Sequence, residues 1–450
     1  MKTRTKNLRS QRALAIAISV IMLTMPVIAR PSNPPVTTAP TESTIVLQTT
    51  GAPLLPGTRQ VVSAVPGNEW NPRVECDAAT YTYDNFQGVS TIHYQDLSTG
   101  ADSVIPGNEV DLLADISGSR VVFTEVTFTG DTVRIFDTIS QTTTVIPGLW
   151  LMNPSIGGNL VAFQDFGSRV FQIGTYDLSS GTVTNLTNDA SYNLNPKVSP
   201  DGGSIIWSKC SPAAEACDIY SATQTSPGVF TTRALTDGNR QSTYDTSTNG
   251  EVAVYISNRT GDRDIYYQPL TGGTEVHLSI PGAQWNPRIS GDLISFEQID
   301  QLRREIFVYD IRSEIVYRVT NPSDSESWSD INVCGDTGRI LYHTLGEDAF
   351  DIYGFTFQVP SLPSDAEDQL DDLIALIRGL NLPPGISNSL ITKLQHAIDA
   401  INASDTATAC SLLTAFTNEC RAQSGKKLTA AQSAQLINSA NQIKTSLGCP

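Results

Sequence analysis

The chain contains an internal repeat in which short β-strand patterns recur between turns at a nearly constant spacing. The clearest copies are PGNEWNPRVE (66–75) and PGAQWNPRIS (281–290), which share Pro-Gly and Trp-Asn-Pro-Arg. Alignment of the Pro-Gly and Asn/Asp turns gives seven segments, whose turns lie 40 to 49 residues apart when their positions are subtracted. This period predicts a β-propeller of seven blades, because a four-stranded blade takes about 40 to 45 residues. The turns lie near Pro66, Pro106, Pro147, Asn188, Asp237, Pro281 and Pro322.

Each repeat has the same order of strand patterns. In the fourth, NPKVSPDGGSIIWSKC (195–210) is followed by DIYSATQ (218–224), and the alternation in SIIWS suits a sheet packed on both faces. The last repeat, from residue 328, has three strand patterns, whereas TRQVVSAV (58–65) is an isolated strand pattern. We therefore expect this N-terminal segment to complete blade seven and close the ring, which removes exposed sheet edges. The predicted fold class is mainly β.

Two phrases carry a resemblance to a known family. SNRTGDRDIYYQPLTGG (257–273) and NPKVSPDGGSIIWS (195–208) resemble the repeats of the TolB-type, PD40 or WD40-like, β-propellers. The resemblance covers residues 56–359, although LLADISG and NPSIGGN in the second and third repeats lack parts of the pattern. It implies a secreted or periplasmic binding scaffold and identifies no substrate.

The C-terminal segment 360–450 changes from period two to period 3.6 and predicts a small all-α domain of four helices. Its phrases GISNSLITKLQHAIDAI and ACSLLTAFTNECRAQSG resemble a helical domain of secreted bacterial proteins called FIMAH. That resemblance implies an accessory interaction role. The apolar stripes are Leu370, Leu373, Ile374 and Ile377; Leu390, Leu394, Ile398 and Ile401; Leu412, Leu413 and Phe416; and Leu436, Ile437, Ala440, Ile443 and Leu447.

The N-terminus predicts export. Residues 1–29 hold five basic residues, no acidic residue and an apolar run that ends at Ala29, the pattern of a cleaved signal peptide. The alternative is a retained membrane anchor, for which this apolar run is short. Residues 30–55 are rich in Pro and Thr and are expected to be a spacer. The predicted location is secreted or periplasmic, without stable membrane insertion after cleavage.

The net charge bears on the partner. The formal charge is −17, and subtraction of the five positive charges of residues 1–29 gives −22. A surface of this sign repels phosphate backbones, and the sequence shows no basic stripe with interleaved aromatic residues. We therefore expect a protein or glycan ligand at a propeller face, and no nucleic acid.

A pattern of charge marks the inner strands. When these strands are aligned on their first Val or Ile, the preceding residues alternate in sign from blade four through the closure to blade two. Inner strands converge near the axis, where alternation lets each charge pair with the next blade. We hypothesise an inter-blade ring of salt bridges beside the channel; the alternative is a chance alternation of solvent-facing side chains. The aligned residues are Arg73, Asp115, Ser155, Lys197, Asp245, Arg288 and Asp330.

Four of the seven cysteines lie in the predicted propeller, and an exported protein can form disulfides. Cys210 and Cys217 flank SPAAEA between two adjacent strands of blade four, which suits a bridge. Cys76 and Cys334 lie near the ends of the inner strands of blades one and seven, which become neighbours on closure. They form either a bridge that locks the ring or two buried thiols.

Three cysteines lie in the helical tail. Cys410 and Cys420 are too far apart along one helix to pair. Cys449 ends the following helix, so in an antiparallel hairpin it meets Cys410. We expect a bridge between Cys410 and Cys449, and a free buried thiol at Cys420.

The sequence shows no established catalytic motif: G-x-S-x-G, H-E-x-x-H, a phosphate-binding loop and a dinucleotide loop are all absent. The four histidines, at positions 93, 277, 343 and 396, fall in unrelated strand and helix patterns and are expected to be structural. Asp218, Asp264 and Asp351 could bind Ca²⁺, but strand capping is the preferred interpretation. We expect no cofactor and no metal site.

Three tryptophans precede inner strands. Trp70, Trp285 and Trp328 are candidates for a platform that stacks on sugars or a peptide, although packing between blades is their commoner role. The resulting hypothesis is a secreted, non-enzymatic β-propeller that binds a protein or glycan, with a helical interaction domain. The alternative is an extracellular polysaccharide lyase or hydrolase that uses channel carboxylates as acid and base.

Overall fold

A computed structural model places the chain in two compact units, residues 1–359 and 360–450. It describes residues 42–211, 217–236, 242–300, 303–320, 326–345, 349–360, 366–380, 382–403 and 405–449. The predicted signal peptide lies outside these residues. Within the described ranges, no helix has both the length and the apolar character needed to cross a membrane.

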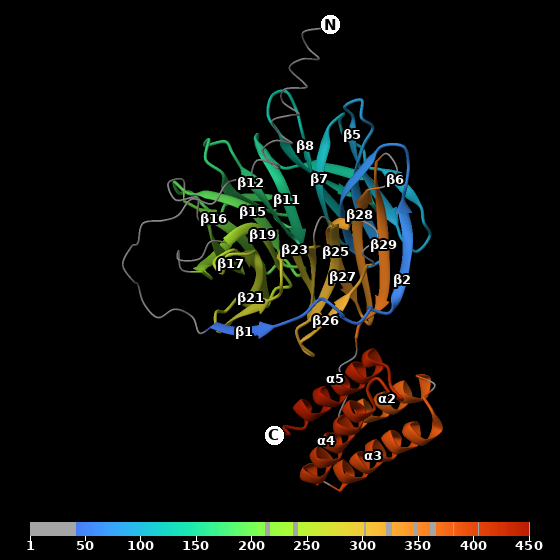
Figure 1. The fold of residues 1–450 in the computed structure, drawn as a ribbon. Helices are drawn as coiled ribbons and strands as arrows, with labels where there is room; N and C mark the ends of the chain where they lie inside the picture. The colour runs from blue at the N-terminus through green and yellow to red at the C-terminus, as the bar shows by residue number, and fades with distance from the viewer. Residues whose placement is uncertain are drawn as a thin grey trace. The chain divides into compact units, whose positions relative to one another are not determined.

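The first unit is a seven-bladed β-propeller, which confirms the predicted fold class (Figure 1). The blades are four-stranded antiparallel sheets that follow one another in sequence order. The first three blades are β3 (Asn68–Glu75), β4 (Ala78–Asp84), β5 (Ser90–Asp96) and β6 (Asp102–Val104); β7 (Asp111–Ser117), β8 (Arg120–Glu125), β9 (Thr132–Asp137) and β10 (Thr142–Val145); and β11 (Leu151–Gly157), β12 (Leu160–Asp165), β13 (Gln172–Asp177) and β14 (Thr182–Asn185).

The remaining blades repeat this arrangement, and the last one takes a strand from the N-terminal end. Blade four has β15 (Tyr192–Val198), β16 (Ser204–Cys210), β17 (Cys217–Ser226) and β18 (Val229–Ala234), and blade five has β19 (Ser242–Thr248), β20 (Val252–Ser257), β21 (Asp264–Pro269) and β22 (Glu275–Ser279). Blade six has β23 (Ala283–Ser290), β24 (Leu293–Asp300), β25 (Arg303–Asp310) and β26 (Ile315–Arg318), and blade seven has β27 (Glu326–Cys334), β28 (Thr337–Leu345), β29 (Phe350–Gln358) and β2 (Gly57–Ser63).

The ring closes as predicted. Strand β2 pairs antiparallel with β29, from Gly57 opposite Phe357 to Ser63 opposite Ile352, and lies beside it in Figure 1. The outer edge of the final sheet is therefore covered by the chain's own N-terminal segment.

The segment before β2 differs from the expected spacer. Strand β1 (Glu42–Val46) adds parallel to β22 at the outer edge of blade five, and Leu54 bridges Arg318 of blade six. Leu47 and Leu55 are buried in the clusters of blades five to seven. The described part of this segment thus runs along three consecutive blades, because its apolar residues and a β-rich run provide both core and edge contacts.

A shared bulge explains why Asn-Pro recurs in the inner strands. In blades one, four and six, the pairing between the first and second strands shifts by one residue, and the extra residue of the first strand has a left-handed φ. Asn71 (φ 55°), Asn195 (φ 52°) and Asn286 (φ 49°) occupy this position, where Asn is tolerated better than most residues. The twin Trp-Asn-Pro-Arg sequences are therefore equivalent bulges of blades one and six.

The core of the propeller lies between neighbouring blades. Ile173 of blade three, for example, shares a fully buried cluster with Ile205 and Trp207 of blade four. Because both faces of each sheet pack on another sheet, the second strands bury apolar side chains on both faces, as Ile205, Ile206 and Trp207 do.

The second unit contains four helices around one core. Thr429 and Gln432 form a capping box at the start of the last helix. The helices are α2 (Ala366–Gly379), α3 (Pro384–Asn402), α4 (Thr406–Gln423) and α5 (Ala430–Ser446), and the core contains Leu370, Ile377, Leu390, Leu394, Leu413, Phe416, Leu436 and Ile443.

Candidate functional site

A cavity of about 110 Å³ lies among the inner strands. Its walls come from the second half of these strands and from the turns that follow, including Glu75, Pro200 and Asn332. Six of the seven residues aligned from the sequence line this cavity, and each belongs to an inner strand. They are Arg73, Asp115, Ser155, Lys197, Arg288 and Asp330.

Hydrogen bonds between blades define one equivalent position in each inner strand, which we call the channel position. Where the channel residue has an acceptor side chain, it accepts the backbone N–H of the residue that follows the channel position of the next blade. The four bonds run from Val74 to Asp330 (3.0 Å), from Ile156 to Asp115 (3.1 Å), from Val198 to Ser155 (3.1 Å) and from Ile289 to Ser247 (3.2 Å).

This pattern corrects the alignment of blade five. Ser247, rather than Asp245, occupies the channel position and lines the cavity. The irregular stretch of β19 runs from Ser242 to Thr246, one residue longer than its counterparts in blades one and six. Because β19 contains no Val or Ile, the sequence offered no residue on which to align it. The negative charge of Asp245 instead acts on Arg263 and Arg288.

Two ion pairs join channel positions of adjacent blades. The Nε atom of Arg73 lies 3.9 Å from Asp115, and the Nε atom of Arg288 lies 3.9 Å from Asp330. Each arginine also donates to the carbonyl of its preceding proline at 2.9 Å, so the two copies of Trp-Asn-Pro-Arg orient their arginines alike. Burial lowers the pKa of Arg288 and raises that of Asp330.

Lys197 has a different environment. It lies between Ser155 of blade three and Ser247 of blade five in ring order, and neither serine carries a countercharge. Among the residues that the structure describes, none forms a hydrogen bond or ion pair with its ammonium group. Burial, reinforced by the positive charge of Arg73, lowers the pKa of Lys197 to about 7.

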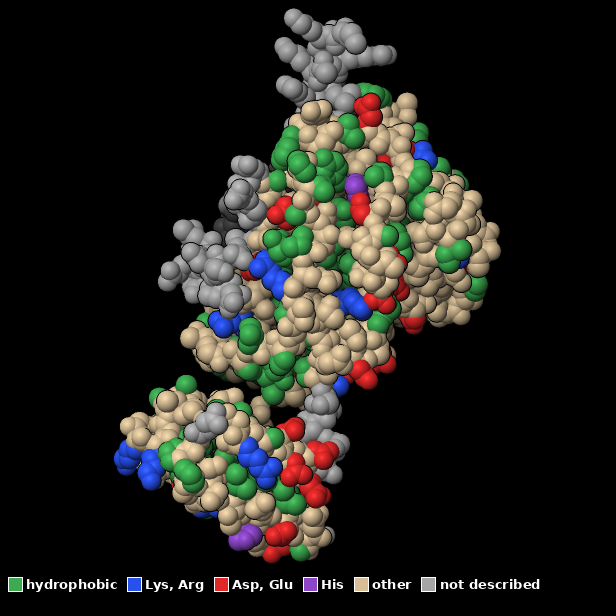
Figure 2. All heavy atoms as spheres, turned by 90° about the vertical axis from the view of Figure 1, so that its right-hand side faces the viewer, with side chains coloured by type: hydrophobic (Ala, Val, Ile, Leu, Met, Phe, Trp, Pro, Cys, Tyr) green, Lys and Arg blue, Asp and Glu red, His purple; other side chains and the backbone are tan. Residues whose placement is uncertain are grey.

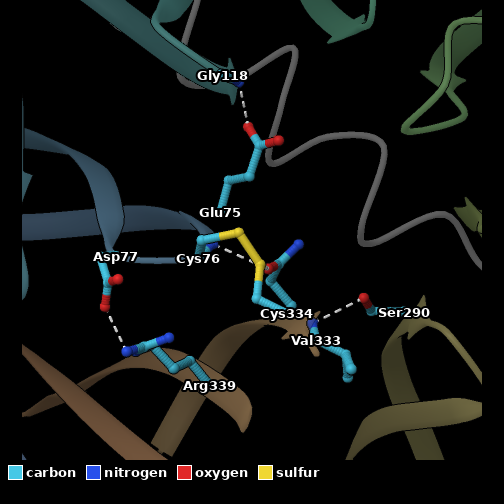
Figure 3. The surroundings of a disulfide bond; sticks show 9 residues. Glu75, Cys76, Asp77, Gly118, Ser290, Val333, Cys334 and Arg339 are labelled. Atoms are coloured by element: carbon cyan, nitrogen blue, oxygen red, sulfur yellow. Dashed lines mark hydrogen bonds and ion pairs between the residues drawn. A yellow bond between two sulfur atoms is a disulfide. The ribbon is translucent and has the colours of Figure 1, made fainter. Parts of the chain in front are cut away.

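A disulfide lies next to two residues of the cavity lining, Glu75 and Asn332, and Figure 3 shows its surroundings. Cys76 and Cys334 are bonded, which decides between the two alternatives left by the sequence. Around this bond, Glu75 accepts the backbone N–H of Gly118 at 2.6 Å, and Asp77 pairs with Arg339. These contacts tie blade one to blades two and seven. Burial raises the pKa of Glu75, and the negative charge of Asp115 adds to this effect.

The other cysteines pair as expected. Cys210 is bonded to Cys217 and Cys410 to Cys449. Cys420 is a buried free thiol whose pKa is raised by burial to about 12, so it packs in the helical core and is not activated as a nucleophile.

The three tryptophans do not form one stacking surface. Trp70 and Trp328 meet edge to face, with ring centroids 6.3 Å apart. Trp285 lies under the guanidinium of Arg263, 3.4 Å from the ring centroid. All three are half-buried at the start of inner strands, where they contact protein groups.

Two of the three aspartates considered for metal binding have side-chain partners in the protein. Asp264 contacts His277 at 2.9 Å and Asp218 accepts from Thr236 at 2.8 Å. Burial raises the pKa of Asp351. Within the described ranges, no three His, Cys, Asp or Glu side chains gather as a metal site.

Sequence reasoning missed a carboxyl pair in blade two. Asp111 and Glu125 face each other across β7 and β8, and both are buried. Burial and the neighbouring Glu125 raise the pKa of Asp111 to about 7. Arg134 binds Glu125 at 2.7 Å. The pair is detectable only once the strand register is known, and it does not line the channel cavity.

A second missed feature is a group of exposed aromatic side chains. Phe86, Phe128 and Trp150 are 63%, 71% and 45% exposed. Phe86 and Phe128 lie between the second and third strands of blades one and two, and Trp150 lies between blades two and three. In antiparallel blades these connections share one face, which we call the aromatic loop face. Figure 2 shows that exposed hydrophobic side chains form separate groups among polar atoms.

Comparisons with solved structures show that the chain shares the β-propeller fold with other proteins. No protein-family model and no curated protein matches the chain. The β-propeller domain of the trilobed protease from Pyrococcus furiosus, described as having an open velcro topology, is 11% identical with a TM-score of 0.51, and the match covers 66% of this chain and 99% of that one. A structure from a study of two prolyl endopeptidases and their inter-domain dynamics is 13% identical with a TM-score of 0.53. This match covers 68% of the present chain and 50% of the endopeptidase chain.

TolB from Acinetobacter baumannii matches at 16% identity with a TM-score of 0.37, over 63% of this chain and 78% of that one. The chain spans about half the length of the prolyl endopeptidase structure that it matches. The matches to the trilobed protease domain and the prolyl endopeptidase show the propeller fold alone. The resemblance of the helical unit to FIMAH stays a prediction.

Proposed function

We propose that the protein is an exported, non-catalytic binding scaffold that takes a protein or glycan partner on the aromatic loop face. The observation that carries this proposal is the exposure of Phe86, Phe128 and Trp150 on connections that share one face of the ring. Aromatic side chains are enriched at protein interfaces and also stack on sugars, so their exposure costs solubility unless they serve a contact.

The loops that carry these side chains are held in place. Val126 donates to the carbonyl of Val110 at 2.9 Å, Leu151 to that of Asp131 at 3.0 Å, and Phe166 to that of Trp150 at 3.0 Å. The connections between blades one and two and between blades two and three are thus bonded to neighbouring loops. A surface ordered in advance loses less entropy on binding, which supports a docking role.

Backbone strain adds to this picture. Phe86 and Trp150 have φ values of 57° and 65°, in the left-handed region that bulky residues rarely adopt. Gly130 leaves room for Trp150, because a Cβ atom at position 130 would lie 3.3 Å from the indole. Such conformations persist where the surroundings impose them, and they concentrate at functional surfaces.

The catalytic alternative has weaker support. In the channel, Asp115 and Asp330 each face an arginine and accept a backbone N–H of the next blade. A general acid or base needs a carboxyl group free to exchange a proton with substrate. These two carboxylates instead join blades, which favours a structural role.

The test compares a variant of the face with a matched control. F86S/F128S/W150S removes the three aromatic groups. I139S/V229S removes exposed apolar groups from the opposite face, since Ile139 lies between the third and fourth strands of blade two and Val229 begins the fourth strand of blade four. We expect the first variant to bind a partner from a glycan array or the native secretome at least about 30-fold more weakly, a loss typical of interface hot spots. The control should bind like the unmodified chain.

Equal binding by all three proteins would contradict the proposal. Protease treatment of the secretome distinguishes a protein partner from a glycan. Breakdown of extracellular polysaccharides, measured with and without EDTA, would instead support the catalytic alternative.

A further inference from the structure

The distribution of charge among the channel positions leaves one cation without a counterion. Arg73 pairs with Asp115 and Arg288 with Asp330, so four of the seven positions form two ion pairs. Lys197 is the third cation. Since Ser247 replaces the expected acid of blade five, the described part of the chain places no carboxylate against the Lys197 ammonium.

The two serines beside Lys197 are suited to hold an anion. Ser155 and Ser247 each accept a backbone N–H of the next blade through Oγ. Within the described ranges, neither hydroxyl group donates its proton to another protein group, and neither residue has a further partner. Each O–H can therefore donate to a ligand held next to the ammonium.

We propose that the channel cavity binds a small oxyanion, with Lys197 as the counterion and the hydroxyl groups of Ser155 and Ser247 as hydrogen-bond donors. The ligand class is a free carboxylate, sulfate or phosphate. This proposal goes beyond the binding scaffold, because the cavity is lined by the second half of the inner strands and the aromatic loop face adjoins their beginnings.

Size and access fit such a ligand. The cavity volume of about 110 Å³ is several times the space that one water molecule requires, and a small oxyanion is only a few times larger than water. The side chains of Arg73, Asp115, Arg288 and Asp330 keep 12–17% of their surface exposed, so solvent reaches the ring.

The surrounding charges define the strength of the site. Arg73 and Arg288 raise the potential at Lys197, whereas Asp115 and Asp330 lower it. Glu75 also lines the cavity, but it accepts the Gly118 N–H. Because these contributions oppose one another, the local absence of a partner for Lys197, rather than the total charge, selects the anion.

The first experiment follows Lys197 itself. Residues 56–359 contain two lysines, Lys197 and Lys209, so ¹³C-dimethylation of the full chain gives two propeller signals, which Lys197→Met assigns. Acetate, sulfate and phosphate are titrated against chloride at constant ionic strength. We expect the Lys197 signal to shift with at least one oxyanion, while the signal of Lys209, which pairs with Asp189, stays in place.

The second experiment measures affinity by calorimetry. Loss of a charge-assisted contact should weaken oxyanion binding at least about tenfold in Lys197→Met, and Lys209→Met, the matched control from the same blade, should bind normally. A Lys197 signal that does not move at tens of millimolar oxyanion overturns the proposal, and this readout does not depend on the folding of any variant. Equal affinity in Lys197→Met overturns it as well.

Binding should also depend on pH. An oxyanion favours the protonated amine, whose pKa in the free protein is about 7. Affinity is then greatest below pH 7 and falls as pH rises above it, by up to about tenfold per pH unit until the pKa of the complex is reached. A flat profile from pH 6 to pH 9 would contradict a role for Lys197 as counterion.

Discussion

Lys197 and Lys209 show how differently one residue type can be used within a single blade. Lys209 lies one residue before the end of β16, binds Asp189 at 2.7 Å and lies over the ring of Tyr220. Lys197 faces the channel without a countercharge, and burial lowers its pKa to about 7. A buried, unpaired cation destabilises a fold, so Lys197 should lower the free energy of unfolding while no anion is bound.

The stability of Lys197→Met tests this environment. In the unfolded chain the amine keeps its usual pKa of 10.5, so between pH 7 and 10.5 the unfolded state binds more protons and the free energy of unfolding rises with pH. We expect Lys197→Met to be more stable than the unmodified protein by about 2–4 kcal/mol at pH 6. At pH 9 this difference in the free energy of unfolding should be smaller by about 2 kcal/mol. Urea unfolding in chloride buffers measures this difference.

Lys209→Met is the control, and its free energy of unfolding should change by less than about 1 kcal/mol. Parallel pH profiles for Lys197→Met and the unmodified protein would show that Lys197 is not held with a lowered pKa.

At the scale of elements, the inner strands explain how seven sheets approach one axis. Their bulges give the strands a common bend, and four of the side chains after the bulges accept a backbone N–H group of the next blade. Close approach requires small residues. Gly157 ends β11, and a Cβ atom there would collide with the carbonyl oxygen of Ser199 in blade four.

Gly157→Ala should therefore destabilise the propeller. The added Cβ atom would force the backbones of blades three and four apart. We expect this to lower the free energy of unfolding by about 2–3 kcal/mol. Gly385→Ala is the control, because nothing lies within 4 Å of its added Cβ and its site is in helix α3. It should leave stability unchanged or raise it slightly. Equal effects of the two substitutions would show that blades three and four do not make this contact.

At the scale of the whole propeller, the ends of the fold are joined twice. Strand β2 completes blade seven, and the bond between Cys76 and Cys334 links residues separated by 258 positions. Strand β1 adds a third element by covering the edge of blade five. Closure therefore combines a strand, a covalent bond and a segment along the outer edges.

The two propeller disulfides should contribute unequally. A cross-link that closes a longer loop removes more entropy from the unfolded chain. Loop entropy gives about 5–6 kcal/mol for the separation of 258 and about 2 kcal/mol for the separation of 7 between Cys210 and Cys217. We expect C76S/C334S to lose about twice as much free energy of unfolding as C210S/C217S under non-reducing conditions. Equal losses would mean that the hydrogen-bonded β2 closure already restrains the ends.

Much of the fold could be predicted because its signals are local and repeated. The spacing of the turns predicted seven blades, and TRQVVSAV predicted the strand that closes them. The twin Trp-Asn-Pro-Arg sequences correctly indicated equivalent positions, since each copy forms the same bulge. Cysteine positions indicated the bridges Cys210–Cys217 and Cys410–Cys449, whereas only the structure decided that Cys76 and Cys334 are bonded.

The sites depended on register and on neighbours distant in sequence. One extra residue in the irregular part of β19 put Ser247 in place of Asp245, which changed a neutral alternating ring into two ion pairs and a lone lysine. The aromatic loop face unites side chains of different blades, and β1 lies far from its partner β22 in sequence. Strand patterns and turn spacing are properties of the chain itself, so sequence determined the propeller. Charge pairing and exposed surface arise from contacts between blades, so tertiary structure alone decided them.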